Sequence, residues 1–505
     1  MLSARRTAAA LSTAAPGRTL LPGEGSFSEP PLLAPDLPGP SSRAAGVPRI
    51  AAAFALPLLV ILVLALVALE SSRPSFLVAG SLSAGLPAWM RGPLGEVLPR
   101  FRLGPSALQD LSSWLLIAIF ACYLVAARWA TRLRPSWTLA AIAAAASIVA
   151  LGPPFDSHDV FNYINYGHMA AVDHLNPYST IPLHGPHAGL SYALSDWRGL
   201  LSPYGPLLTQ LTEPLATLGV ATALWALKLL DVAAYFVMLA LVWRCAKLLG
   251  RSPTTAVAFV GLNPLALVWA LGGVHYDVLV MALVVGGVYL CLSARAAPIG
   301  DAMRRQLFAG AAFAFAVALK APALLFVPIV ALRARSRRFL FGLGTAGAGL
   351  AAVSVASFGL HGPALGKQDN LISTHAPADV VGYLLGLGGE THGIHLALSV
   401  LLVVALLGCC AWTWRSPDDW LTAAGTLTLV FVTTLSWTVP WYVLWVLPFA
   451  ALGSRRLRWA TLATSACFLI LFAPAEPRLA ARIGLNPYST QIGQAAGRAV
   501  AAFGG

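Results

Sequence analysis

Long apolar runs, separated by short polar connections, dominate the chain from about residue 50 onward. Most of these runs approach the ~20 residues that a helix needs to cross the hydrocarbon core of a bilayer. This pattern predicts an all-α polytopic membrane protein with about thirteen crossings. The expected ranges are 50–69, 113–130, 137–152, 220–243, 255–272, 277–294, 307–320, 321–334, 339–358, 394–414, 420–437, 440–453 and 458–474. Pro322 and Pro328 interrupt 307–334, so two short or re-entrant helices fit that stretch as well as two full crossings.

Two segments lie outside this apolar body. Residues 1–48 are rich in Ala, Pro, Gly and Ser and contain no apolar run long enough for a span. They are expected to form a disordered cytoplasmic tail rather than a signal peptide. Residues 49–474 form the predicted transmembrane domain, with 153–219 as its first major outer loop. Residues 475–505 form a C-terminal tail, which this layout places outside the cell.

The distribution of positive charge indicates how the helices are oriented. The chain has a net charge of +13 and a mean hydropathy of +0.74, and its basic residues fall in short clusters between apolar runs. This distribution argues against a nucleic-acid partner, which would bind a basic domain or face. With the N-terminus inside, alternate connections carry the Arg and Lys excess typical of cytoplasmic loops, and most acidic residues fall on the other side. We therefore expect a multi-pass protein with an extracytoplasmic active face.

Asp156 and Asp159 stand at the start of the first long outer loop, directly after an apolar run. Their i, i+3 spacing would place both carboxylates on one face of a helix at the membrane surface, where a carboxylate could accept a proton from a sugar hydroxyl. Asp156 follows a Gly-Pro-Pro sequence and would also suit the N-cap of that helix. We therefore favour Asp159 as the reactive carboxylate and keep Asp156 as the reserve.

Five histidines in the same outer loop do not show the spacing of a metal site. None forms an HExxH arrangement, and most lie in Pro/Gly-rich sequence where exposed histidine is common. We expect no metal; contact between a histidine such as His158 and a sugar or phosphate is the more modest alternative.

Three more titratable residues stand out at the predicted outer boundary. His275 and Asp277 occupy a short turn that also contains two glycines. The need to reverse the chain explains the glycines but not the two titratable side chains, so structural and functional interpretations have equal weight. Lys320 lies between apolar stretches, where an unpaired ammonium is costly. It either extends to the interface or binds an anion such as a lipid phosphate, for which Arg198 and Lys367 are weaker candidates.

Two further motifs have both structural and functional interpretations. The sequence Ser202-Pro-Tyr-Gly-Pro206 predicts a turn in which Gly205 permits close backbone approach, and its place in the chain predicts a wall of the substrate groove. Trp441 and Tyr442 belong to an aromatic cluster at an outer boundary. A membrane-interface belt explains most of that cluster, although aromatic faces also stack on sugars and line grooves for polyprenyl tails.

Two motifs inside predicted spans favour structural roles. Lys228 and Asp231 are three residues apart and are expected to form an ion pair with each other. The sequence Gly342-Leu-Gly344-Thr-Ala-Gly347 matches a dinucleotide-binding pattern, but no strand precedes it, so it predicts close helix packing.

Taken in chain order, a set of motifs carries a family resemblance. The motifs are Asp159-Val-Phe-Asn-Tyr163 with Gly167, Asn176-Pro-Tyr178, Ser202-Pro-Tyr-Gly-Pro206, His275-Tyr-Asp277, Lys320-Ala-Pro322 and Pro440-Trp-Tyr-Val-Leu-Trp445. Over about residues 50–474, the chain resembles the GT-C glycosyltransferases that use polyprenyl-phosphate mannose. It is most similar to the actinobacterial α-1,6-mannosyltransferases of lipomannan and lipoarabinomannan synthesis.

The resemblance implies an inverting transfer of mannose from a polyprenyl phosphate to a mannan-type glycan or glycolipid, with formation of an α-1,6 linkage on the outer face of a bacterial plasma membrane. It makes 49–474 the catalytic domain and 153–219 its first catalytic loop, with Asp159 as general base and Asp156 in reserve. The expected partners are the lipid donor, the acceptor and membrane lipids, without nucleic acid, metal or other cofactor. Together, the motifs and the residues discussed above give these predicted substrate-binding residues: His158, Tyr163, Asn176, Tyr178, Tyr204, His275, Asp277, Lys320, Arg198, Trp441 and Tyr442.

Two other classes of function compete with this interpretation. A lipid-linked sugar flippase or secondary transporter would also have many spans, but it should show an internal repeat and carboxylates inside the membrane. In this chain only Asp231 lies deep in a predicted span. A non-catalytic scaffold for envelope synthesis would need no donor groove, and consumption of a lipid donor would separate it from an enzyme.

Overall fold

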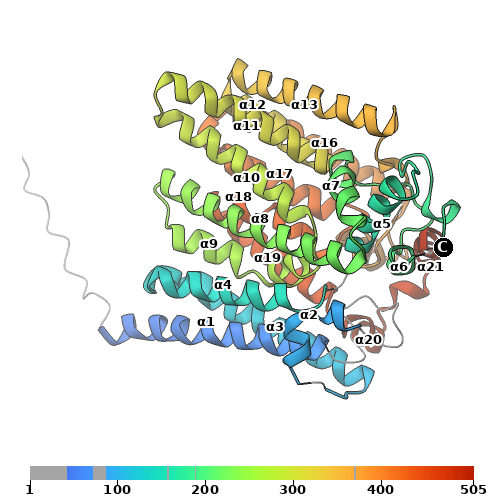
Figure 1. The fold of residues 1–505 in the computed structure, drawn as a ribbon. Coiled ribbons are helices and arrows are strands. Elements are labelled where there is room, and N and C mark those ends of the chain that lie inside the picture. The colour runs from blue at the N-terminus through green and yellow to red at the C-terminus, as the bar shows by residue number, and fades with distance from the viewer. Residues whose placement is uncertain are drawn as a thin grey trace, which may run out of the picture. The chain divides into compact units, whose positions relative to one another are not determined.

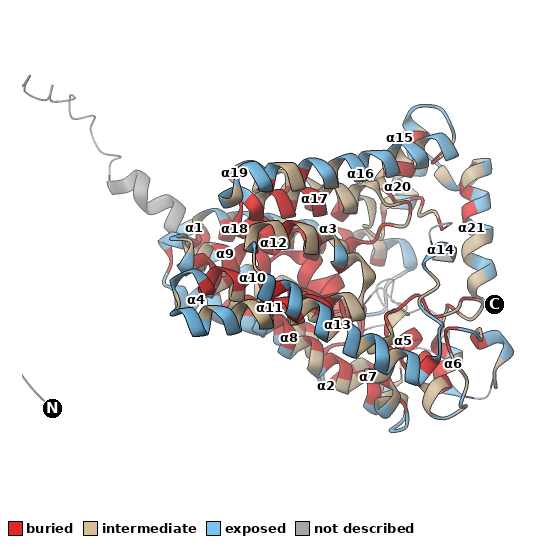
Figure 2. Ribbon diagram, turned by 90° about the horizontal axis from the view of Figure 1, so that it is seen from above, coloured by how far each residue is buried: buried red, intermediate tan, exposed pale blue. Residues whose placement is uncertain are grey.

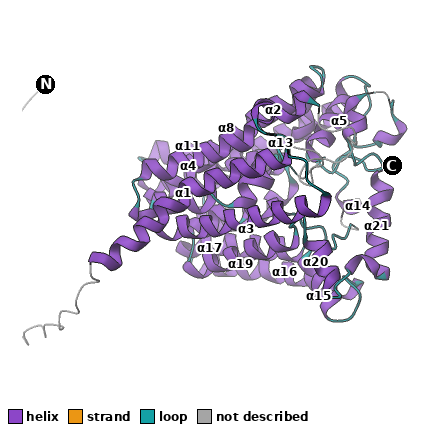
Figure 3. Ribbon diagram, turned by 90° about the horizontal axis from the view of Figure 1, so that it is seen from below, coloured by secondary structure: helices purple, strands orange, loops and turns teal. Residues whose placement is uncertain are grey.

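The computed structural model describes residues 42–71, 87–99, 101–155, 158–187, 189–368 and 371–504. Within these ranges every regular element is a helix, and loops connect them (Figures 1 and 3). The all-α prediction is therefore confirmed. Asp156 and most of the predicted N-terminal tail lie outside the described residues, so the division into domains and the reserve role of Asp156 stay predictions.

Seven helices among the described residues are long and apolar enough to cross a membrane. They are α1 (Ser42–Glu70), α3 (Pro105–Trp129), α8 (Val220–Leu248), α10 (Asp277–Ser293), α11 (Ile299–Leu319), α13 (Arg337–Phe358) and α16 (His392–Arg415). Two bent pairs raise the number to nine if each is one span. The pairs are α9 (Pro253–Gly261) with the π-helical segment η3 (Leu265–Leu271), and α19 (Arg455–Leu471) with α20 (Glu476–Arg482). The polytopic prediction is confirmed.

The count of thirteen crossings is not confirmed, because four expected spans form shorter helical segments. These are α4 (Pro135–Leu151), η5 (Ala321–Leu325) with α12 (Phe326–Ala334), α17 (Trp420–Thr434), and η7 (Pro440–Trp445) with α18 (Leu447–Leu452). A proline is the first residue of α4 and of η7 and the second residue of η5. Its fixed φ suits a first helical turn, and its missing N–H removes one orphan donor. The break at Lys320 separates α11 from η5; α11 is long enough to cross a membrane, so the short-helix interpretation of 307–334 agrees with the structure only for 321–334.

The connections between helices gather at two ends of the bundle (Figures 1 and 2). One end carries α5 (Asp159–Ala171), α6 (Leu190–Leu194), α7 (Pro206–Ala216), α15 (Pro377–Leu384), α20 and α21 (Gln491–Gly504). At the other end lie the junctions that follow α3, α8, α10, α12, α16 and α18. These junctions hold most of the basic clusters of the sequence, such as those around Arg134, Arg251 and Arg337.

The bundle has a buried centre (Figure 2), and many large apolar side chains are exposed on its exterior. In α10, 72% of the membrane-spanning window is buried, against 6% in α16. The exposed side chains of α16 include Val400, Val404 and Leu407. An apolar outer surface of this kind suits lipid contact, because lipid tails offer no hydrogen-bond partner to a polar side chain. The central α10 therefore holds its first residue, Asp277, inside the protein.

The predicted ion pair between Lys228 and Asp231 is wrong for the described residues. The Lys228 ammonium instead donates to the carbonyl of Gly152 and lies 4.8 Å from the ring centre of Trp225. The i, i+3 spacing allows a pair on one helix face, but the packing of α8 against the end of α4 offers Lys228 a carbonyl and an aromatic face instead.

Close helix packing at the glycine motif is confirmed at one position. A Cβ on Gly342 would come within 2.0 Å of the carbonyl oxygen of Leu307, whereas Gly344 and Gly347 face open space. Gly342 therefore permits α13 to approach α11 closely, and the other two glycines do not take part in that contact.

Candidate active site

A cavity of about 510 Å³ opens at the end of the bundle that carries α5, α6 and α7. Segments that are far apart in the sequence form its wall: the start of α5, the 196–204 loop, the break after α11, and η7. Among the substrate-binding and catalytic residues predicted from sequence, six line it: His158, Asp159, Tyr204, Lys320, Trp441 and Tyr442. The sequence therefore located six of the residues around this cavity, and their roles stay predictions.

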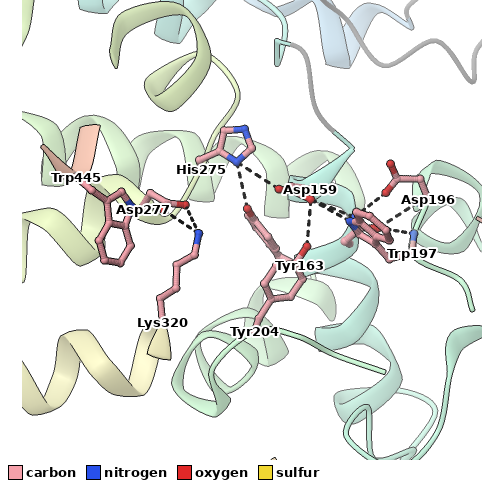
Figure 4. Close-up of polar contacts among 10 residues, drawn as sticks. Asp159, Tyr163, Asp196, Trp197, Tyr204, His275, Asp277, Lys320 and Trp445 are labelled. Atoms are coloured by element: carbon pink, nitrogen blue, oxygen red, sulfur yellow. Dashed lines mark hydrogen bonds and ion pairs between the residues drawn. The ribbon is translucent and has the colours of Figure 1, made fainter. Parts of the chain in front are cut away.

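Asp159 begins α5 and faces the polar centre of the site (Figure 4). Its Oδ1 accepts hydrogen bonds from Trp197 Nε1 at 3.1 Å and from the Tyr204 hydroxyl at 3.1 Å. Its Oδ2 lies 3.5 Å from His275 Nδ1, and the side chain retains 19% exposure. The first turn of a helix favours a carboxylate electrostatically, and these donors fix its direction.

The pKa of Asp159 is raised to about 6 by burial and, second, by the charge of Asp196. The hydrogen bond from Trp197, the charge of Lys320 and the hydrogen bond from Tyr204 oppose this rise. At neutral pH the carboxylate is therefore mostly ionised, yet its proton affinity is higher than that of a solvated aspartate. That combination suits a general base.

Asn162 fixes the loop that brings Asp196 and Trp197 to the site. Its Nδ2 donates to Asp196 Oδ1 at 2.7 Å, and its Oδ1 accepts from the Ser195 hydroxyl at 2.8 Å and the Trp197 backbone N–H at 3.2 Å. Asn162 is fully buried, one helical turn after Asp159. Asp196 and Trp197 were not predicted as site residues, because nothing in their local sequence places them beside α5. The polar Asn162 within the Asp159–Tyr163 motif was the available signal.

His275 connects the carboxylate to the aromatic wall. It follows Val274, whose φ of 58° turns the chain between η3 and α10. The Phe155 N–H donates to the carbonyl of Gly272 at 2.9 Å, and this hydrogen bond connects the turn to the segment before α5. The buried imidazole stacks on Trp441 with ring centres 3.6 Å apart, and its Nδ1 lies 3.4 Å from the Tyr163 hydroxyl.

Burial, followed by the charge of Lys320, lowers the pKa of His275 well below its usual value, so the ring is neutral. With Asp159 ionised, the tautomer that carries hydrogen on Nδ1 is the one that can donate to Oδ2. A neutral donor orients the carboxylate without neutralising its charge. His275 is thus placed to position Asp159 rather than to contact the reacting atoms.

Lys320 is paired, which the sequence left open. Its Nζ lies 2.8 Å from each oxygen of Asp277, and Trp445 Nε1 donates to Asp277 Oδ1 at 2.6 Å (Figure 4). Nζ also lies 5.0 Å and 4.8 Å from the ring centres of Tyr276 and Tyr442. The side chain of Lys320 is 16% exposed and that of Asp277 is 1% exposed, so the cation faces the cavity and its counter-ion lies behind it.

The turn at Ser202–Pro206 packs against the end of α11, and Gly205 permits the close backbone approach that the sequence predicts. The Gly205 N–H donates to the carbonyl of Leu319 at 3.1 Å, directly before Lys320. The turn also places the Tyr204 ring against Tyr163, with ring centres 4.8 Å apart. Through Gly205 and Tyr204, the turn therefore joins the lysine side of the cavity to its carboxylate side.

Gly205→Ala is expected to destabilise the protein by roughly 1–3 kcal/mol, because the new methyl group would overlap backbone that cannot move freely. A Cβ at this position would come within 2.0 Å of the carbonyl oxygen of Ala318. The melting temperature of the purified protein in detergent should fall accordingly. Gly344→Ala is the matched control, since a Cβ there meets nothing within 4 Å. Equal melting temperatures for the two variants would contradict the close approach.

Three residues predicted to bind substrate do not line the cavity. Asn176 Nδ2 donates to the carbonyl of Phe358 at 2.7 Å, and the Tyr178 hydroxyl lies 2.7 Å from Thr209 Oγ1. Arg198 donates from Nε to the carbonyl of Tyr192 at 3.2 Å. These contacts stabilise the loops behind the cavity wall, and substrate contact by Asn176, Tyr178 and Arg198 stays a prediction from the sequence.

Tyr163, His275 and Asp277 also lie behind the lining, but each contacts a residue that lines the cavity. Tyr163 packs on Tyr204, His275 on Trp441, and Asp277 pairs with Lys320. Trp437, Ser436 and His375 line the far side of the cavity. They had no site role in the sequence-based prediction.

Comparison with known proteins gives one family and several relatives. A family profile described as "Alpha-(1->6)-mannopyranosyltransferase, N-terminal domain" matches residues 74–336, just over half of the chain. The match includes Asp159, His275 and Lys320. No solved structure matches the chain.

Three relatives show how far the similarity extends. The chain is 27% identical over 346 residues to alpha-(1->6)-mannopyranosyltransferase A of Mycobacterium tuberculosis. The aligned region covers 64% of this chain and 67% of that protein. It is 30% identical over 181 residues to the protein of the same name from Corynebacterium glutamicum, covering 35% of this chain and 34% of the relative. It is 26% identical over 370 residues to a probable alpha-(1->6)-mannopyranosyltransferase of Mycolicibacterium smegmatis, covering 62% and 65%.

Proposed function

The chain belongs to the family of alpha-(1->6)-mannopyranosyltransferases, and on this premise we propose that it moves mannose from a polyprenyl-phosphate donor to a mannan-type acceptor with inversion at the anomeric carbon. The observation that carries the proposal is the cavity that Asp159 and Lys320 line together. A displacement reaction needs a base for the proton of the attacking hydroxyl and a cation for the departing phosphate anion, and one cavity holds both groups.

In the proposed reaction, Asp159 takes the proton of an acceptor hydroxyl while that oxygen attacks the anomeric carbon. The new carbon–oxygen bond forms on the side opposite the phosphate, and the electron pair of the broken bond leaves with the phosphate oxygen. A β-linked mannose on the lipid thereby becomes α-linked on the acceptor. Lys320, held in place by Asp277 and Trp445, stabilises the departing phosphate.

The cavity also suits an isoprenoid donor. Phe431, Leu435 and Phe472 line it together with the aromatic side chains of η7, so an apolar wall adjoins the charged groups. An isoprenoid chain needs apolar contact, whereas its phosphate needs a cation. Trp437 and Trp197, whose ring centres are 5.8 Å apart, add aromatic faces suited to sugar rings.

The two ends of the bundle support a proposal for the side of the membrane on which the cavity lies. The cavity lies at one end and most of the basic clusters lie at the other. Because cytoplasmic connections carry the Arg and Lys excess, we assign the basic end to the cytoplasm and the cavity to the outer face of the plasma membrane. A lipid-carried sugar agrees with this orientation, since nucleotide sugars are not supplied outside the cell.

A direct assay tests the proposed function. Purified protein is incubated with polyprenyl-phosphate mannose and a short α-mannoside, and the linkage in the product is determined. An α-1,6-linked product with inversion supports the proposal; no consumption of the donor overturns it and favours a scaffold or flippase. A parallel sample with chelator tests the prediction that no metal takes part.

The transfer rate is expected to rise with pH around a midpoint of about 6. Asp159 has its pKa raised to about 6, and only the ionised form can accept the proton, so kcat/KM falls below this midpoint and levels off above it. Initial rates from about pH 5 to about pH 8 measure the profile.

Asp196→Asn provides the control for this assignment. The charge of Asp196 raises the pKa of Asp159, so its removal should move the midpoint of the profile to lower pH. A rate that is independent of pH across the range, or a midpoint that moves upward in this variant, would assign the base to another group.

A further inference from the structure

A second cavity, of about 300 Å³, lies at the basic end of the bundle. Its walls come from η1 (Ala130–Arg132), the start of α9, the end of α18 and the start of α19. It takes no part in the reaction described above, because the active-site cavity lies at the other end. Its lining therefore needs an explanation of its own.

Two arginines face this cavity without an acidic residue in its lining. Arg251 donates to the carbonyl of Gly453, which fixes its direction. Burial and then the charge of Arg458 lower the pKa of Arg251, so the two cations share one environment. Like charges held close together are unfavourable unless an anion compensates them.

Arg458 has no partner for its guanidinium within the described part of the chain, and its Nε is shielded from solvent and makes no hydrogen bond. A buried donor left in this state costs free energy comparable to a lost hydrogen bond. The charge and the unused donor both indicate that an acceptor outside the chain completes the site. An anion with several oxygens would satisfy Arg458 and Arg251 together.

Hydroxyl groups line the cavity together with the two arginines. Ser252 caps the N-terminus of α9 by accepting from the Thr255 N–H at 3.3 Å and from the Thr255 hydroxyl at 3.1 Å, so the hydroxyls of Ser252 and Thr131 are the neutral donors that an anion could use. The positive end of the α9 dipole thus lies at the same place as the two cations. Hydroxyls, guanidinium groups and a helix N-terminus are the usual ligands of a phosphate group.

We propose that this pocket binds the phosphate group of an anionic membrane lipid. Phe259 and Ala256 form an apolar part of the lining beside the charged groups, as a headgroup with attached acyl chains requires. The pocket also lies where apolar helices end, at the level of lipid headgroups. Basic pockets between membrane helices suit anionic headgroups for these reasons. The inference does not depend on the proposed transfer reaction.

The test compares lipid binding by the purified full-length protein and by variants. Short-chain phosphatidylglycerol and phosphatidylcholine are titrated separately, and bound lipid is measured by mass spectrometry of the intact complex. The wild type should bind phosphatidylglycerol more tightly, and Arg458→Gln should weaken that binding about tenfold, as the loss of a charge-assisted hydrogen bond predicts. Because the Arg458 side chain bonds no described residue, this variant should keep the wild-type melting temperature.

Arg455→Gln and Arg456→Gln are the matched controls, since both positions lie on the same helix and are exposed. They should retain the wild-type preference for phosphatidylglycerol. Equal weakening in the controls, or equal binding of the two lipids by the wild type, would overturn the proposal. Full displacement of phosphatidylglycerol by inorganic phosphate would also overturn it, because the ligand would then be a soluble anion.

Discussion

Asp159→Asn is expected to lower the rate of mannosyl transfer about 10²–10⁴-fold, while the protein still inserts and folds. An asparagine side chain can keep its oxygen toward Trp197 and Tyr204, whose hydrogen bonds to Asp159 Oδ1 are both 3.1 Å long. It cannot take a proton from the acceptor hydroxyl. Initial rates with polyprenyl-phosphate mannose and an oligomannoside measure the loss, and the melting temperature reports folding.

Asp173→Asn is the matched control for this substitution. Asp173 follows the same helix, lies 3.9 Å from His168 and does not line the cavity, so its replacement should leave the rate near that of the wild type. Asp156→Asn belongs in the same experiment because Asp156 is the reserve base. Near-normal turnover by Asp159→Asn, with loss in Asp156→Asn, would transfer the role to Asp156.

Asp277→Asn is expected to destabilise the protein by about 3–5 kcal/mol, because breaking a buried ion pair leaves one charge without compensation. Lys320 would retain the aromatic faces of Tyr276 and Tyr442 but lose both oxygens that lie 2.8 Å from its Nζ. The free energy of unfolding in detergent, measured with a denaturant series, gives the change. Transfer should fall as well, since the cation that we propose to face the phosphate is no longer fixed.

The double variant Asp277→Asn/Lys320→Met separates stability from catalysis. Removal of both charges should recover most of the lost stability, whereas transfer should stay low without the cation. Asp418→Asn is the control for a broken ion pair at an exposed site, because the Arg295 and Asp418 side chains are 54% and 89% exposed. That change should affect stability little. Recovery of transfer in the double variant would exclude Lys320 from stabilising the phosphate.

The same pair shows where prediction from the sequence stops. Lys320 stands out because a cation between apolar runs needs a partner, and Asp277 stands out as an unexplained acid in a turn. Their pairing follows from the packing of α10 against α11, which brings the two residues within 2.8 Å across 43 positions of sequence. Nothing local to either residue specifies that distance.

The amino-acid sequence by itself determined that this is a helical membrane protein, and it located Asp159, Lys320 and three of the aromatic residues that line the cavity, Tyr204, Trp441 and Tyr442. These properties are local, because span length, charge clusters and motif order depend on neighbouring residues. The tertiary structure decided which side chains meet. It brought Trp197 and Asp196 to Asp159 through Asn162, and it gave Lys228 a carbonyl instead of the aspartate one turn away. Such contacts depend on the relative positions of several packed helices, which no single stretch of sequence fixes.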